Sequence, residues 1–238
     1  MMNQDSAGPA IDQLEQSLTS SRLPYLAALI LALLALPAFA LDISLARYVA
    51  QVNLPGDVRD LVRISEVFAH GLGVALILIT VLVLVPERRR HVLRLFACAA
   101  GSGCLALLIK NTIARRRPQS LHMQDWQGSV WSTFEGWAPW ISGQGSGGNH
   151  LQSFPSGHTA TAVGLAVGLA FLWPRGRWLF ASFAALAALQ RIDCGAHFLS
   201  DTLVAAALAC LVAGFCIDRR AVGKHFDRWE AKATDKDD

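Results

Sequence analysis

Charged residues are scarce in this chain of 238 residues. Asp, Glu, Lys and Arg together make up 16% of it, whereas hydrophobic residues make up 53%, and the mean hydropathy is +0.37. This composition is more apolar than that of a soluble globular domain and indicates a membrane protein. The net charge of +3 is too small to indicate nucleic-acid binding, so we expect no nucleic acid as a partner.

Several common kinds of site are also missing. Four of the five cysteines lie inside apolar runs, where a thiol packs as a small hydrophobe, so no disulfide framework is expected. These are Cys98, Cys104, Cys210 and Cys216. Cys194 lacks the downstream arginine with which a cysteine-based phosphatase holds phosphate, and we interpret it as a packing residue. The glycine-rich stretch 142–148 lacks the Gly-Lys-Ser/Thr ending of a P-loop and is interpreted as a linker.

Six apolar segments predict an all-α, polytopic membrane protein, a bundle of six transmembrane helices. Several approach the roughly 20 residues that cross a bilayer, and adjacent polar residues can complete the shorter ones. The segments are Leu23–Leu41, Ile64–Pro86, His91–Ile109, Thr159–Trp173, Trp178–Leu189 and Thr202–Ile217. We expect one domain at 23–217 between two cytoplasmic tails, 1–22 and 218–238, the first forming at most a short surface helix. Ala38-Phe39-Ala40 resembles a signal-peptidase site, but acidic residues precede it, so we expect no cleavage.

Basic residues predict the orientation of this bundle. They cluster after the second, fourth and sixth segments, which places those ends and both termini in the cytoplasm. The clusters are Arg88–Arg90, Arg175 with Arg177, and Arg219 and Arg220 with Lys224. The loops from Lys110 to Ser156 and from Arg191 to Ser200, including Gly145 and Gly195, then face outward.

The first outward loop has an unusual composition. It is basic at Arg115–Arg117, against the charge rule, which indicates a functional need for positive charge. It also contains four tryptophans, a residue that prefers the headgroup level of a membrane. These are Trp126, Trp131, Trp137 and Trp140. We therefore expect loop 119–154 to lie on the membrane surface.

Lys110 and Arg117-Pro118 form the first of three polar clusters at the outward ends of the segments. The two cations are seven positions apart, which is about two helical turns, so both point the same way if the helix continues to Pro118. The alternative is that they are ordinary basic residues that reach the headgroups from a helix end.

Ser156, Gly157 and His158 form the second cluster, just before the fourth segment. Ser156 supplies a capping oxygen, and Gly157 lets the chain approach a ligand closely. Backbone N–H groups at the start of a helix bind phosphate, and His158 would lie in that first turn. The alternative is a capping turn with an incidental histidine.

Arg191, His197 and Asp201 form the third cluster, before the last segment. His197 and Asp201 are four residues apart, so on a helix the carboxylate can hold one ring nitrogen while the other points away. This pairing makes imidazole a better nucleophile. The alternative is a structural hydrogen-bonded pair at the membrane edge.

Together, Lys110-x6-Arg117-Pro118, Pro155-Ser156-Gly157-His158 and Arg191-x5-His197-x3-Asp201 resemble the three-part signature of the type 2 phosphatidic acid phosphatase (PAP2) superfamily, which also includes vanadium haloperoxidases. Gln190 departs from the serine that many members have at this position. The resemblance implies that His197 attacks phosphorus, that Asp201 orients it and that His158 protonates the leaving oxygen. It implies that the phosphate is held by Lys110, Arg117, Arg191, Ser156 and Gly157.

The resemblance also implies that the enzyme needs no metal and no cofactor, and the sequence agrees because it has no carboxylate cluster for magnesium. We expect an integral phosphatase of a bacterial plasma membrane, with its site on the outer side. The expected substrates are a phosphorylated lipid such as phosphatidylglycerophosphate, phosphatidic acid, undecaprenyl pyrophosphate or a lipid A phosphate. The alternatives are a lipid phosphotransferase of the same family and a non-catalytic phospholipid binder or transporter; six apolar spans disfavour a soluble haloperoxidase. No obligate protein partner is expected.

Glu66 and His70 are two further candidate residues, outside the signature. They are four apart near the outward end of the second segment and share a face if that segment is one helix. Ionisable residues within a span face a cavity or each other. They are therefore expected either to line the substrate pocket or to bond to each other.

Overall fold

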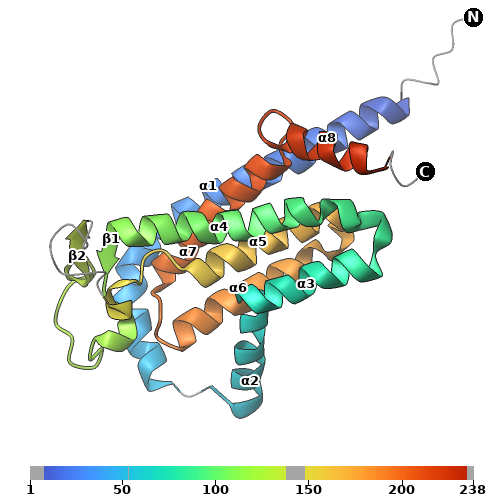
Figure 1. Cartoon of the computed structure of the whole chain (residues 1–238). Coiled ribbons are helices and arrows are strands. Elements are labelled where there is room, and N and C mark those ends of the chain that lie inside the picture. The colour runs from blue at the N-terminus through green and yellow to red at the C-terminus, as the bar shows by residue number, and fades with distance from the viewer. Residues whose placement is uncertain (1–7, 53, 138–147, 235–238) are drawn as a thin grey trace, which may run out of the picture.

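The computed structural model describes residues 8–52, 54–137 and 148–234, with side chains for those between 22 and 231. Eight α-helices dominate this part of the chain (Figure 1). They are α1 (Gly8–Gln51), α2 (Gly56–Ile64), α3 (Gly71–Leu84), α4 (Val92–Thr112), α5 (Gly157–Leu172), α6 (Arg177–Asp193), α7 (Leu199–Ile217) and α8 (Gly223–Thr234). Two short strands, β1 (Ile113–Arg115) and β2 (Phe134–Trp137), pair antiparallel at one end of the bundle. The all-α prediction is confirmed, with this small sheet as the addition.

The long apolar helices have the character of membrane spans. By length and composition, spans are found at 22–51, 86–112 and 199–217, and a fourth if α2 and α3, which are bent by 67° relative to each other, count as one. The helices α5 and α6 have 16 and 17 residues, fewer than the roughly 20 that cross the hydrocarbon core. Six spans therefore stay a prediction.

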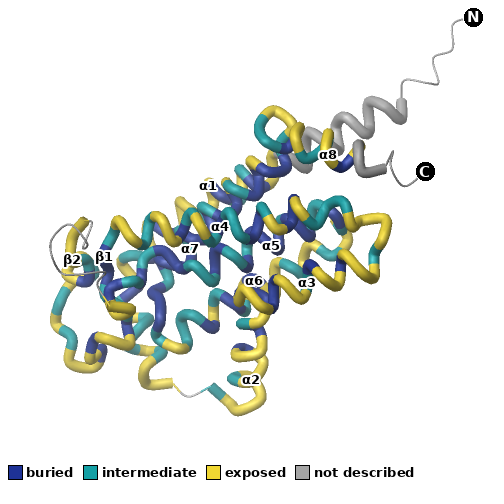
Figure 2. The backbone as a smooth tube through the Cα atoms, in the orientation of Figure 1, coloured by how far each residue is buried: buried dark blue, intermediate teal, exposed yellow. Residues whose placement is uncertain are grey.

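Small residues hold the centre of the bundle together. Figure 2 shows that α5 and α7 are largely buried, whereas α1 and α3 carry many exposed positions. Ala106, Ala160, Ala205 and Ala209 form one fully buried cluster between α4, α5 and α7. A Cβ atom on Gly164 would lie 2.2 Å from the carbonyl oxygen of Cys98, so only glycine allows α5 to approach α4 this closely. Such contacts are typical of helices packed in membranes.

The second apolar segment is not one helix, which corrects the placement of Glu66 and His70. Glu66 lies in a 3₁₀ turn (Ser65–Phe68), and His70 has an extended backbone and caps α3 through its ring and the Leu72 N–H. A Cβ on Gly73 would lie 1.8 Å from the Val67 carbonyl oxygen, so this glycine lets the chain fold back on α3. Glu66 and His70 therefore share no helix face.

The helix that carries Lys110 ends earlier than predicted. α4 stops at Thr112, and Ile113 is already extended and begins β1. Directly after β1, the Arg116 N–H donates to the Thr133 carbonyl. The helical argument for aligning Lys110 with Arg117 is therefore wrong. Pairing with β2, a segment about twenty residues away in sequence, decides the local structure here.

Both tails contain helix. α1 begins at Gly8, so the segment expected to form at most a short surface helix continues directly into the first apolar run. In the second tail, α8 is bound to α4 by Arg94, whose guanidinium donates to Asp227 at 2.5 Å and to Glu230 at 2.8 Å. Residues 138–147, including Trp140, Gly145 and most of the glycine-rich stretch, lie outside the described residues.

Candidate active site

The three polar clusters meet at the end of the bundle that carries the small sheet (Figure 1). Backbone hydrogen bonds join the segments that hold them. The Gln119 N–H donates to the Gly195 carbonyl at 2.8 Å, and the Ser156 N–H donates to the Asp201 carbonyl at 3.3 Å. The parts of the signature, distant in sequence, are thus directly connected.

His197 lies in the turn between α6 and α7 and is 3% exposed. Its Nδ1 is 2.5 Å from the carbonyl oxygen of Ser153, while the nearest Asp201 oxygen is 3.8 Å away. Since a carbonyl can only accept, Nδ1 carries the proton and Nε2 has the free lone pair. The carboxylate was expected to hold the ring, but the backbone carbonyl does so, and Asp201 acts on it from the longer distance.

Asp201 is fully buried in the first turn of α7. It accepts hydrogen bonds from Ser153 Oγ at 2.6 Å and from the Phe198 N–H at 2.8 Å, and it also pairs with the Arg115 guanidinium. The Ser153 residue thus contacts Asp201 through its side chain and His197 through its carbonyl. This shared contact fixes the imidazole relative to the carboxylate.

Three cations gather beside His197. Lys110 interacts electrostatically with Arg117, Arg191 and Asp201. Burial lowers the pKa of the Arg117 guanidinium, and the charge of Arg191 lowers it further, although it stays protonated. The Nε of Arg117 is buried and has no hydrogen-bond partner among the described residues. Clustered cations with an unused buried donor are suited to an anion with several oxygens.

The second cluster forms the start of α5. Ser156 is fully buried, and its Oγ accepts from the Thr159 N–H at 3.4 Å and from Thr159 Oγ1 at 2.9 Å. A Cβ on Gly157 would meet nothing within 4 Å, so open space adjoins the first amides of the helix. His158 follows in the same turn, as the signature predicted. The helix start can therefore offer N–H groups to a ligand.

Glu66 and His70 both lie beside His158. A Glu66 carboxylate oxygen is 2.9 Å from an Arg191 nitrogen and 3.6 Å from His158 Nε2, and the rings of His70 and His158 are 6.3 Å apart. Gln190, where many family members have serine, donates weakly to Glu66 at 3.5 Å and accepts from Arg191. The described contacts of these two residues therefore join the proposed site rather than each other's side chains.

Asp42 and Arg115 are two residues near the site that the sequence analysis did not single out as candidates. Arg115 pairs with both Asp42 and Asp201, and all three are buried. The signal for Asp42 was a lone acid directly after the first apolar run, since ionisable residues in such places usually have a task. Arg115 was noted only as part of the basic loop.

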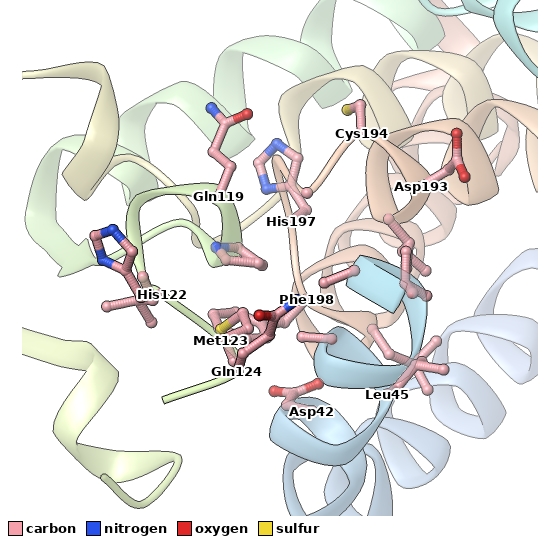
Figure 3. A pocket seen from close by; sticks show the side chains of 18 of the residues that line it. Asp42, Leu45, Gln119, His122, Met123, Gln124, Asp193, Cys194, His197 and Phe198 are labelled. Carbon is pink, nitrogen blue, oxygen red and sulfur yellow. The ribbon is translucent and has the colours of Figure 1, made fainter. Parts of the chain in front are cut away.

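A cavity of about 380 Å³ opens beside His197, between the end of α1, loop 118–125 and the turn before α7 (Figure 3). Its described lining includes the carboxylates of Asp42, Asp125 and Asp193 and contains neither lysine nor arginine. A phosphate is therefore disfavoured in this cavity, and the three cations beside His197 are better suited to hold one. Among the described residues, no three His, Cys, Asp or Glu side chains are grouped as metal ligands.

The state of His197 leads to a testable pH dependence. Burial lowers the pKa of its imidazole below the usual 6.5, Asp201 partly opposes this, and Lys110 and Arg117 add to it. A lowered pKa keeps the ring neutral, and so nucleophilic, to lower pH. We expect the acid limb of kcat/KM to have its midpoint below pH 6.5. The measurement uses two substrates whose phosphates differ in their second pKa. An acid limb caused by titration of the enzyme has the same midpoint with both substrates, whereas one caused by titration of the substrate moves. A common midpoint above 6.5 would contradict the expectation.

Comparisons with known proteins agree with the resemblance found in the sequence motifs. The sequence model of the family described as the PAP2 superfamily matches residues 91–221. A protein of Rhizobium etli named lipid A 1-phosphatase is 34% identical over 109 residues, which cover 46% of this chain and 41% of that protein. A protein of the same name from Rhizobium johnstonii is also 34% identical over 109 residues, or 39% of its length. The chain thus matches less than half the length of either relative. No solved structure matches significantly.

Proposed function

Because the chain belongs to the PAP2 superfamily, we propose that it is a membrane lipid phosphatase that works through a phosphohistidine at His197. One observation carries this proposal. Nδ1 of His197 faces a backbone carbonyl at 2.5 Å, which leaves Nε2 as a nucleophile close to three cations. A site that only bound lipid phosphate would need the cations but no such imidazole.

The reaction follows from these positions in two steps. Nε2 of His197 forms a bond to phosphorus while the bond from phosphorus to the lipid oxygen breaks, and His158 gives its proton to that oxygen. Burial and the charge of Arg191 lower the pKa of the free His158 imidazole to about 4, so this step requires that the negative charge of the bound phosphate raises that pKa. Water then attacks phosphorus and gives a proton to His158, and the bond to His197 breaks to release phosphate. Charge on the phosphoryl oxygens is stabilised by Lys110, Arg117 and Arg191 together with Ser156 Oγ and the Gly157 N–H.

We expect the substrate to be a phosphomonoester or pyrophosphate of a lipid, and a nucleophile beside three cations supports this expectation. The names of the two relatives favour a lipid A phosphate among the expected substrates. Glu66 would favour a phosphate without further negative charge on that side, since a carboxylate repels it. A phosphotransferase would share the first step and differ only in the acceptor, a lipid in place of water.

The proposed placement in the membrane retains six spans, at a bacterial plasma membrane with the site on the outer side and both termini in the cytoplasm. Lys110, Arg117 and Arg191 meet at the end of α4 near the tryptophan-bearing loop, while Arg88–Arg90 lie in the 3₁₀ turn that precedes the start of α4. The separation of these two basic groups along α4 supports the proposal. The domain limits, 23–217 with tails 1–22 and 218–238, belong to the same proposal.

Hydrolysis without metal is the direct test of the function. Purified protein with radiolabelled lipid A 1-phosphate, phosphatidic acid, phosphatidylglycerophosphate and undecaprenyl pyrophosphate is expected to release phosphate in excess EDTA at an unchanged rate. The three side-chain cations neutralise the phosphoryl group in place of magnesium. Adding back magnesium is the control. Loss of activity in EDTA that magnesium restores would contradict metal independence, and transfer of label to a second lipid would indicate the phosphotransferase.

A further inference from the structure

A buried ion cluster lies behind the proposed nucleophile. Arg115 is 0% exposed, Asp42 1% and Asp201 0%. One nitrogen of the Arg115 guanidinium is 2.7 Å from Asp42, and another pairs with Asp201. The rings of Phe39, Phe134 and Phe198 surround the guanidinium, with centroids 5.5, 4.7 and 4.3 Å from its central carbon. The enclosure replaces water, so these three charges must stabilise one another.

Asp42 comes from α1, far outside the three-part signature. Its carboxylate accepts from the Ser200 N–H at 3.0 Å and from Ser200 Oγ at 2.5 Å, and Ser200 Oγ in turn accepts from Arg115 at 2.8 Å. Ser200 precedes Asp201 in the first turn of α7. In Figure 3, Asp42 on α1 lies near Phe198, next to the turn that carries His197. Asp42 therefore fixes the residue beside the carboxylate that acts on His197.

The charge balance of the cluster matters as much as its geometry. It holds one cation and two carboxylates, so one negative charge is left over, and the Asp201 oxygen is 3.8 Å from His197 Nδ1. Inside a protein such a charge is felt more strongly than in water. If Asp42 were neutral, Arg115 and Asp201 would form a neutral pair. The imidazolium of His197 would then lose much of its stabilisation.

We infer that Asp42 is a positioning residue for phosphoryl transfer: it occupies one arm of the Arg115 guanidinium and the Ser200 amide, so that Asp201 keeps both its place and its charge toward His197. The inference rests on the proposed function of His197. It is not a direct role, because Asp42 contacts the imidazole only through Arg115, Ser200 and Asp201 in the described structure.

The other groups that act on His197 set the direction of the expected effect. They are Asp201 on α7, Lys110 on α4, Arg117 after β1, Arg191 in the last turn of α6 and His158 on α5. Asp201 is the negative one among these described groups, so any weakening of its field is not compensated. Asp42→Asn should make the imidazole less basic and shift the acid limb of kcat/KM to lower pH.

The experiment measures this limb in the full-length protein in lipid nanodiscs. We expect Asp42→Asn to shift it downward by about half a unit to one unit and to slow phosphohistidine formation by about tenfold. Asp125→Asn, which removes a carboxylate that lines the same cavity outside the cluster, is the matched control and should leave the limb in place. A limb that stays in place in Asp42→Asn, with only a lower melting temperature, would show that Asp42 merely packs α1 and would overturn the inference.

Two further variants decide the question even if Asp42→Asn folds poorly. Arg115→Met leaves two carboxylates without their cation and should shift the limb upward. The double variant Asp42→Asn/Arg115→Met leaves Asp201 alone with the same net charge as the original cluster, so its limb should return toward that of the wild type. A double variant whose limb equals that of Arg115→Met would mean that Asp42 has no influence, and the inference would fail.

A second readout separates this inference from the proposed function. The pH dependence of His197 modification by diethyl pyrocarbonate, followed by mass spectrometry, reports the neutral imidazole without any turnover. If wild-type protein forms no phosphohistidine, the proposed function fails, yet the Asp42→Asn shift in modification remains measurable. If labelling is normal and neither readout shifts, only the role of Asp42 is refuted.

Discussion

Replacing His197 with alanine is expected to abolish turnover, by more than about ten-thousandfold, because the chain then lacks the nitrogen that we propose as the nucleophile on phosphorus. The cations, the α5 start and His158 remain, so lipid binding should persist. The measurement has two parts: phosphate release from the radiolabelled lipid, and trapping of acid-labile, alkali-stable label on the protein after rapid quenching. Both signals should disappear together.

His122→Ala is the matched control for this experiment. His122 lines the cavity beside His197 but lies on the side without cations, so turnover and labelling should stay near those of the wild type. A fully active His197→Ala protein would end the proposed mechanism. Wild-type protein that binds the lipid without acquiring any label would favour the alternative of a binder or transporter.

His158→Ala is expected to lose about a hundredfold to ten-thousandfold in rate on a lipid phosphate, which is the usual range for removal of a general acid. An alkoxide is a poor leaving group without a proton. With p-nitrophenyl phosphate the first step needs no acid, so label should still accumulate on His197. The comparison of the two substrates by rapid quench therefore distinguishes an acid from a residue that only shapes the site.

The variant Glu66→Gln tests the acid role of His158 by changing the carboxylate beside it. It keeps the shape of the Glu66 side chain but removes the charge 3.6 Å from His158 Nε2. The rate on the lipid substrate should therefore fall more than the rate on p-nitrophenyl phosphate. The loss should be smaller than that of His158→Ala. Equal losses of His158→Ala on both substrates would contradict its role as the acid.

Much of the site could be predicted from the sequence because its residues stand at fixed spacings beside apolar runs. Lys110, His158 and His197 were placed at the ends of helices that meet, and the structure brings them together. The break at His70 could not be predicted, since the hydropathy of 64–86 is continuous and the bend depends on contact between Gly73 and the Val67 backbone. A backbone carbonyl as the partner of His197 leaves no trace in a motif of side chains.

The end of α4 and the ion cluster could not be predicted either, because both depend on residues that lie far apart in the sequence. Lys110 and Arg117 have the spacing of a helix, yet pairing of β1 with a strand far along the chain turns the backbone at Ile113. Asp42 and Arg115 are 73 residues apart, and no local pattern relates them. The lone acid at Asp42 indicates a task, but its partner becomes visible only when long-range packing is known.

Burial of Arg94 depends on a helix that is synthesised much later than Arg94 itself. Its guanidinium, 2% exposed, is bound by Asp227 and Glu230 of α8, which follow it by 133 and 136 residues. When α4 leaves the ribosome, therefore, neither carboxylate yet exists, and the positive charge must stay with water or lipid headgroups. The final burial of Arg94 therefore has to wait for α8, which is synthesised after every helix that contributes to the proposed active site.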